Sequence, residues 1–223
     1  MSKNNTRELA DLYVKEVIRK YNPKFEIKQK SESKLFKILR PILLLINPNF
    51  FKAYVTTLFG TMWVTESFFE DNTRMGVLQV VAHEGVHEHD RKKKFPPVVF
   101  ELLYMFPHWL VLPFLVLAFI HSWWWLLPTV WSIAPGFAPG RFYLEMRGYS
   151  VERLWSKHVR VGNFNPNPFI VYQLSNVRTY WAAWPFKKHI NKKLSSDVDE
   201  SDPAFKDILD FLKRHDLLKK GKN

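Results

Sequence analysis

Two histidines one helical turn apart, with a glutamate beside the first, form the pattern in this sequence that is best suited to chemistry. Residues 80–94 read VVAHEGVHEHDRKKK, in which His83, Glu84 and His87 match the motif HExxH. In a helix, residues i and i+4 lie about 40° apart around the axis, so both imidazoles face the same way and can bind one Zn²⁺. Glu84 lies beside the first ligand and can take a proton from a water that the metal activates.

A zinc site needs a third protein ligand, and the sequence offers a carboxylate further along the chain. One class of HExxH protein has a histidine six residues after the second histidine of the motif, but Lys93 stands there in this chain. Glu145, in the stretch FYLEMRGYS, lies mid-helix among aromatic residues. A carboxylate is costly to bury there unless a cation meets it, which makes Glu145 well suited to bind a metal.

With a β-hairpin ahead of the HExxH helix and a glutamate on a later helix, residues 54–155 resemble the gluzincin group of zinc metallopeptidases. The resemblance implies that His83, His87 and Glu145 bind zinc and that Glu84 is the general base. The chain departs from the larger members at Tyr149, where they have an aspartate that orients a histidine. The EMRGY helix after an apolar insertion is also similar to small HExxH proteins encoded by tailed phages.

Several polar residues near these motifs have two interpretations each. Tyr149, Arg147 and Tyr180 are candidates to support the ligands or to stabilise a transition state. The alternatives are a place in the core for the tyrosines and a surface position for the arginine. His89 points away from His83 and His87 by helical count, so we expect it at the surface and not at the metal.

The composition restricts the partners and the chemistry. The net charge of +12 suits a solvated basic surface, an anionic membrane or nucleic acid. No motif of a nucleic-acid-binding module is present, so no specific nucleic acid is expected. The chain has no cysteine, which excludes disulfides, a thiol nucleophile and cysteine-ligated zinc. The N-terminal residues are polar and charged, so no secretory signal is expected.

Hydrophobic periodicity predicts the elements that must position these residues. Pro41 is expected to kink or break the helix that contains it, Ser31 or Ser33 to cap that helix, and Asp71 or Asn72 to cap the HExxH helix. The other expected elements are helices over residues 6–21, 31–47, 141–158, 169–185 and 204–220, a strand within 24–30, and a β-hairpin with arms 53–58 and 61–67.

Residues 98–133 form an apolar segment whose acidic and basic side chains are Glu101, His108 and His121 alone. Its length suits a helical hairpin with a turn near residues 121–123. The two halves of the expected metal site flank the segment, so the chain must leave and return on the same side. The segment is therefore expected either to re-enter a membrane, with the site on the cytoplasmic face, or to lie in the interface of a large protein assembly.

Together these features predict a mainly helical α+β fold. It would have a zincin-like core, a short β-hairpin before the HExxH helix and an apolar helical hairpin insertion. The expected division is an N-terminal helical segment 1–52, a metal-site domain 53–95 with 134–195, the insertion 96–133, and a linker with a C-terminal helix 196–223. The expected function is a zinc-dependent hydrolase, a peptidase acting on a protein or peptide substrate. The alternative is a non-catalytic structural or interaction component of a viral particle or membrane complex that retains a zinc site.

Overall fold

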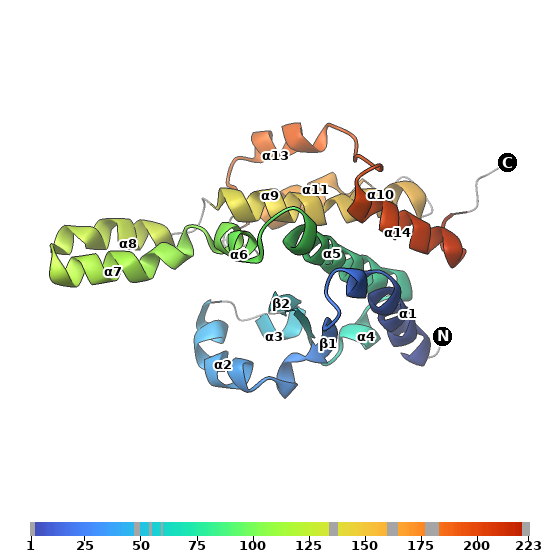
Figure 1. Cartoon of the computed structure of the whole chain (residues 1–223), viewed down its shortest axis with the longest axis horizontal. Coiled ribbons are helices and arrows are strands. Elements are labelled where there is room, and N and C mark those ends of the chain that lie inside the picture. Colours follow the sequence, from blue (N-terminus) through green and yellow to red (C-terminus); the bar gives the residue numbers. More distant parts are fainter. Residues whose placement is uncertain are drawn as a thin grey trace. The chain divides into compact units, whose positions relative to one another are not determined.

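The computed structural model describes residues 3–46, 50–53, 55–58, 60–133, 138–159, 165–176 and 183–219. These residues are mainly helical with one small sheet, which confirms the expected mainly helical α+β class (Figure 1). The chain divides into two compact units, Met1–Lys94 with Asp199–Asn223, and Phe95–Val198. The metal-site domain expected from the sequence, 53–95 with 134–195, stays a prediction.

The first unit contains the sheet and the HExxH helix. Its elements are α1 Lys3–Glu16, η1 Ile18–Lys20, β1 Glu26–Gln29, η2 Lys30–Glu32, α2 Lys34–Ile46, α3 Phe50–Ala53, β2 Thr56–Leu58, β3 Thr61–Val64, α4 Phe68–Asp71, α5 Arg74–Lys93 and α14 Pro203–Arg214. The expected strand within 24–30 and the expected β-hairpin are confirmed, although both arms of the hairpin are shorter than expected. The first arm begins only at Thr56 because residue 53 belongs to α3, and the second ends at Val64, before a turn at residues 66–67.

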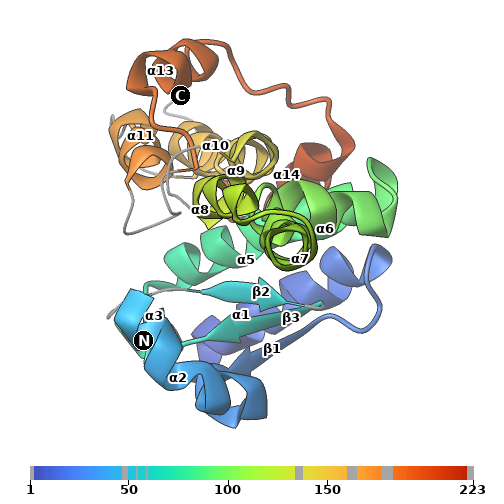
Figure 2. The same ribbon diagram turned by 90° about the vertical axis from the view of Figure 1, so that its left-hand side faces the viewer.

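The three strands lie in the order β1-β3-β2, with β1 parallel and β2 antiparallel to β3 (Figure 2). Met62 and Val64 alternate along β3 and are fully buried, as expected for a strand with one face on a core. The hairpin turns at Gly60, which has φ +74°, a conformation that glycine adopts without steric cost. A Cβ at this position would lie 2.3 Å from the Asn22 amide nitrogen, so glycine also lets the loop after η1 come close.

Helix α5 is held in the first unit by α1 and α14. A Cβ at Gly85 would lie 3.3 Å from Tyr13 Oη and 3.3 Å from Ile18 Cγ1, so α1 and η1 pack closely against α5 at this point. Tyr13 also packs edge-to-face on Phe211 of α14, with ring centroids 4.9 Å apart. Ion pairs join the same elements, since Lys20 Nζ lies 3.0 Å from Asp207 Oδ1.

A buried lysine follows β1. Lys30 is 2% exposed, its ammonium donates to the carbonyl oxygen of Phe50 at 2.7 Å, and it lies 3.7 Å from the centroid of the Phe50 ring. Burial lowers the pKa of Lys30 to about 7, because a charged ammonium loses its hydration there. The carbonyl and the aromatic face compensate part of that loss when the side chain is protonated.

The second unit is helical throughout its described residues. Its elements are α6 Pro97–Met105, η3 His108–Leu110, α7 Val111–Ile120, η4 Trp123–Trp125, α8 Leu126–Ile133, α9 Pro139–Gly148, α10 Ser150–His158, α11 Asn167–Ser175 and α13 Lys187–Leu194. A buried cluster packs α9 against α11 and α13, and it includes Phe142, Ile170, Leu174 and Ile190.

The apolar segment forms the expected helical hairpin. Helices α7 and α8 lie side by side, and the chain turns at His121 and Ser122 as predicted (Figure 1). Among the described residues, no single helix has both the length and the apolar character of a membrane span. In this part of the chain, only a pair of helices, Val98–Met105 with His108–Ile120, reaches that length and apolar character together. The chain bends by 88° between the two members of the pair.

Four expectations about local structure need correction. Pro41 does not break its helix, because α2 runs through it from Lys34 to Ile46, and the kink that was the other expectation stays a prediction. Thr73 rather than Asp71 or Asn72 caps α5, and its Oγ1 accepts a hydrogen bond from the backbone of Gly76 at 3.1 Å. The expected helix 141–158 is two helices that meet at Tyr149. The expected helix 169–185 ends at Ser175, because the backbone of the next residue is extended.

Candidate metal centre

His83 and His87 lie one turn apart on α5, as the sequence predicts. Both are buried at 6% exposure, and their ring centroids are 5.0 Å apart with the planes at 75°. By helical count Gly85 lies about 180° around the axis from the midpoint of the two histidines. The close packing of α1 at Gly85 therefore fixes the opposite face of α5 and leaves the imidazole face to other partners.

Glu145 is buried on α9, at 2% exposure. Its Oε1 accepts a hydrogen bond of 2.7 Å from the hydroxyl of Tyr104 on α6. The two helices approach closely near this bond, because a Cβ at Gly140 would lie only 2.2 Å from the carbonyl oxygen of Leu103. Glycine at position 140 therefore permits the helix contact that brings the tyrosine to the carboxylate.

Arg141 supports Tyr104 from the first turn of α9. Its Nε donates to the carbonyl oxygen of Tyr104 at 3.2 Å, and its guanidinium carbon lies 5.3 Å from the centroid of the tyrosine ring. These contacts restrict the ring and so orient the hydroxyl toward Glu145. Tyr104 is not one of the residues predicted from sequence to act at the site, although it is the one tyrosine of the apolar segment 98–133.

Among the residues that the structure describes, His83, His87 and Glu145 form a group that could hold a metal ion. Each offers one ligand atom, and these atoms all lie within 4.8 Å of one another. Two imidazole nitrogens and one carboxylate oxygen are ligands that zinc and other transition metals accept, so the donor set fits a metal. The three side chains that the sequence predicts as ligands are the members of this group, and the identity of the metal stays a prediction.

Glu84 follows His83 on α5 and is half-buried. One residue along a helix corresponds to about 100° around the axis, so its carboxylate leaves the helix beside the imidazole pair and not on the same line. This position suits a group that acts next to a metal without binding it. The role of Glu84 as general base stays a prediction.

The three other candidates have different outcomes. Tyr149 is buried in the cluster that contains Ile170 and Leu174, and its ring centroid lies 6.2 Å from that of Phe169, so it has the core position that was the alternative interpretation. Arg147 is half-buried on α9. Tyr180 lies outside the described residues. A role for any of them near a metal stays a prediction.

The expectation that His89 lies at the surface was wrong. It is 3% exposed, its Nδ1 lies 3.1 Å from Asp90 Oδ1, and its ring packs edge-to-face on Tyr21 with centroids 4.9 Å apart. Helical count placed it correctly on a different side from His83, but that side of α5 is covered by the segment around Tyr21.

Glu88, directly after His87, also has a structural role that accounts for part of the polar run in this sequence. This carboxylate is 2% exposed and accepts hydrogen bonds from the Asn22 amide, at 2.9 Å, and from the Arg91 guanidinium. It joins α5 to the loop after η1, which is the loop that approaches Gly60. The residues after His87 therefore stabilise the first unit, whereas His83 and His87 belong to the group that could hold a metal ion.

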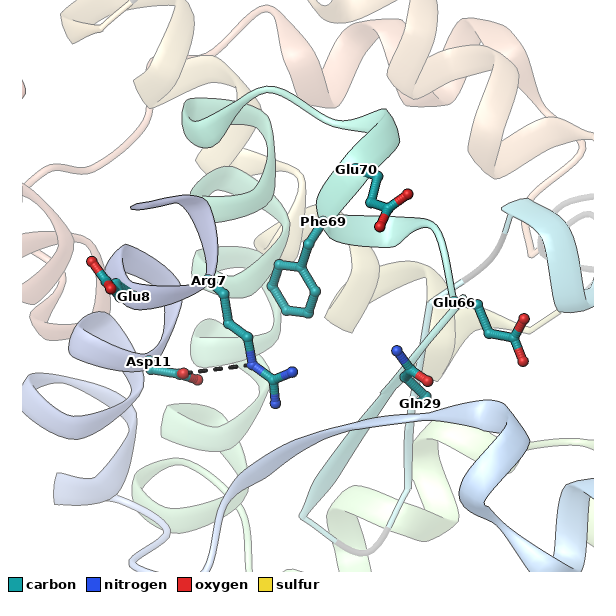
Figure 3. Close-up of a pocket in the computed structure, with 7 residues that line it drawn as sticks. All are labelled: Arg7, Glu8, Asp11, Gln29, Glu66, Phe69 and Glu70. Atoms are coloured by element: carbon teal, nitrogen blue, oxygen red, sulfur yellow. Dashed lines mark ion pairs between the residues drawn. The ribbon is translucent and has the colours of Figure 1, made fainter. Parts of the chain in front are cut away.

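A separate hollow lies on the first unit, formed by α1, β1 and α4 (Figure 3). It measures about 310 Å³, and Arg7 lies in it over the ring of Phe69, 5.4 Å from the centroid, while pairing with Asp11 at 3.8 Å. None of its lining residues comes from α5. The hollow is therefore not built around the histidines of the candidate metal centre.

Comparisons with known proteins give no relative for this chain: no family model, no curated protein and no solved structure matches it.

Proposed function

We propose that the protein is a zinc-dependent hydrolase, and specifically a peptidase, whose Zn²⁺ is held by His83, His87 and Glu145. The observation that carries this proposal is the buried group of three ligand atoms within 4.8 Å of one another. The order of the elements supports a zincin-like core, since the β2–β3 hairpin precedes the HExxH helix and the glutamate follows on α9.

The number and type of ligands favour a catalytic zinc over a structural one. Structural zinc sites are closed by four protein ligands, mostly cysteines, whereas catalytic sites have three and keep one position for water or substrate. The chain has no cysteine, and the group found among the described residues has three members. The fourth position is thus left for a water and for the oxygen of a scissile carbonyl.

A bound Zn²⁺ supplies Lewis acidity at this position, lowering the pKa of water and polarising a carbonyl. The carboxylate of Glu84 accepts the proton of the attacking water and then delivers it to the nitrogen of the leaving amine, which balances the hydrolysis of a peptide bond. Its place beside the imidazoles on α5, half-buried, supports this role.

Tyr104 orients the carboxylate ligand in this proposal. Its hydroxyl donates a hydrogen bond to Oε1 of Glu145 and so restricts the orientation of the carboxylate. Hydrogen-bonded neighbours of this kind set the orientation and basicity of a ligand. The carboxylate is fixed before the metal arrives, so that less conformational entropy is lost on binding.

The proposal is tested by separating zinc binding from hydrolysis. Glu84→Gln should retain one zinc per chain, measured by elemental analysis, and should cleave none of a panel of unfolded protein substrates that the unmodified chain cleaves. Glu145→Gln should lose zinc. Glu101→Gln, an exposed carboxylate on α6, is the matched control and should keep both properties. Turnover retained in Glu84→Gln contradicts the assignment of the general base.

A non-catalytic component of a viral particle or membrane complex is the second candidate. The exposed aromatic and aliphatic side chains of α7, η4 and α8 favour it, because they provide a large surface for assembly. One zinc per chain with no turnover on any substrate of the panel would favour this candidate over the hydrolase.

A further inference from the structure

The α7–α8 hairpin exposes large apolar side chains along its whole length. In α7 no residue is buried, and Phe119 and Ile120 near the turn are 90% and 76% exposed. Trp123 and Trp124 continue this surface beyond the turn at 62% and 60% exposure. The other large apolar side chains exposed on the hairpin are Leu112, Val116, Leu126, Leu127 and Val130.

Two hydroxyl-bearing side chains are buried in the hairpin, whereas many of its large apolar side chains are exposed. The two buried residues recorded in α8 are Thr129 and Ser132, whose hydroxyls donate to the carbonyl oxygens of Trp125 and Thr129 at 2.9 and 2.8 Å. His108, at the base of the other arm, places Nδ1 2.7 Å from the carbonyl oxygen of Ser132. Phe114 and Trp125 stack between the arms, with centroids 5.8 Å apart.

The exposure of so many large apolar side chains is not the distribution that water imposes. A helix pair in water buries its apolar stripes and exposes its polar ones. In a bilayer the lipid is as apolar as leucine, so helices face each other with small and hydroxyl-bearing residues and turn their large apolar side chains outward. Hydroxyls bonded to backbone carbonyls also remain satisfied without water.

The extent of the surface distinguishes lipid from a protein partner. A protein partner covers one side of a hairpin, but here both arms and the turn carry exposed apolar side chains, and α7 buries none. Between Glu101 and Arg141 the sequence has no Asp, Glu, Lys or Arg. A continuous apolar medium suits such a surface, whereas a protein interface normally ends in a polar rim.

The lengths of the two helices determine how deeply the hairpin can enter a bilayer. Helix α7 has ten residues and α8 has eight. At 1.5 Å per residue the longer arm reaches about 15 Å, which is half of the roughly 30 Å hydrocarbon core. We propose that the α7–α8 hairpin inserts into one leaflet of a phospholipid bilayer, with Phe119, Trp123 and Trp124 near the bilayer midplane. This inference does not depend on the metal centre.

The absence of cysteine allows a direct test with single labels. Phe119→Cys is labelled with an environment-sensitive fluorophore and mixed with vesicles of phosphatidylcholine and anionic phosphatidylglycerol, chosen because the chain is basic. Its emission should shift to the blue and be quenched by a lipid that carries a quencher deep in its acyl chain. The control, Phe186→Cys, is 57% exposed in the same unit but outside the hairpin, and should show neither change.

Vesicle flotation provides the second measurement. The double variant Phe119→Asp, Trp124→Asp should bind at least tenfold more weakly, because a charged aspartate near the midplane strongly opposes insertion into the hydrocarbon core. Phe186→Asp, the matched control, should bind as the unmodified chain does. All variants should keep the far-ultraviolet circular dichroism spectrum, since the substituted side chains are exposed.

Three results would overturn the inference. The first is an unmodified chain that does not float with these vesicles. The second is an equal loss of binding in Phe186→Asp, which would show that the hairpin has no special role. The third is a change from oligomer to monomer in the double variant without any effect on vesicles, which would assign the surface to a protein interface.

Discussion

The hydrogen bond from Tyr104 to Glu145 offers the sharpest test of how the proposed metal centre is organised. Tyr104→Phe removes the hydroxyl and leaves the ring that packs against Arg141. The hydroxyl of Tyr104 donates to the carboxylate at 2.7 Å, a normal length for an O–H···O hydrogen bond. The variant therefore removes one contact of one ligand and keeps all three ligands.

Two independent magnitudes give the size of the expected effect. A hydrogen bond to a charged group contributes about 1.5–3 kcal/mol. Loss of a side chain that orients a metal ligand weakens metal binding by about 10- to 100-fold, which corresponds to about 1.4–2.7 kcal/mol. Because the two ranges overlap, we expect the Kd for zinc to rise about 10- to 100-fold in Tyr104→Phe.

The assay is a competition titration against a chelator of known zinc affinity. Tyr143→Phe is the control, because it makes the same chemical change on the helix that carries Glu145, at a side chain that is 50% exposed. Its Kd should equal that of the unmodified chain, whereas Glu145→Gln sets the value for a lost ligand.

A Kd for Tyr104→Phe within twofold of the unmodified value, with Glu145→Gln strongly impaired, would refute the orienting role of the hydroxyl. Equal weakening in Tyr143→Phe would also refute it, since the effect would then reflect general destabilisation.

Three further predictions concern stability, and urea denaturation measures each of them. Gly140→Ala should destabilise the protein by about 1–3 kcal/mol, because a Cβ there would lie 2.2 Å from the carbonyl oxygen of Leu103. This loss should exceed the gain from the better helix propensity of alanine. An unchanged midpoint of denaturation would contradict the close contact between the helices. Thr73→Ala should cost about 1 kcal/mol through loss of the cap of α5, and no loss would show that the cap does not matter. Lys30→Met should change the pH dependence. The folded pKa of Lys30 is lowered from 10.5 to about 7, so between these values the unfolded chain holds a proton that the folded chain has released. The stability of the unmodified chain relative to Lys30→Met should therefore rise with pH across this window, by at most about 1.4 kcal/mol per pH unit, and stay constant below it; a constant difference from pH 7 to 10 would refute the shift.

Strong local patterns allowed part of this structure to be predicted from the sequence. The spacing of His83 and His87, the β-branched run around Gly60 and the apolar run after Lys94 each specify a local element, and all three elements are present. Glu145 was predicted to join the histidines because a carboxylate among aromatic residues needs a partner, and its ligand atom lies within 4.8 Å of theirs.

Features that depend on distant contacts could not be predicted in this way. The burial of His89 comes from Tyr21, 68 positions earlier in the chain, and no helical count contains that information. Tyr104 lies in an apolar run without a clear period, so nothing local distinguishes it from a packing residue. The approach of α6 to α9 depends on Gly140, whose importance is visible only beside Leu103.

The order of the elements along the chain affects when the HExxH helix acquires its final packing. Helix α14 packs in the same unit as α5 and α1, but about 110 residues separate Lys94 from Pro203, and they form the second unit. At about 5–20 residues per second, a ribosome needs roughly 5–20 s to make that stretch. During this interval α5 has emerged without α14, so the nascent first unit exposes the apolar side that Phe211 later covers. Folding of the first unit is therefore completed only after the second has been synthesised.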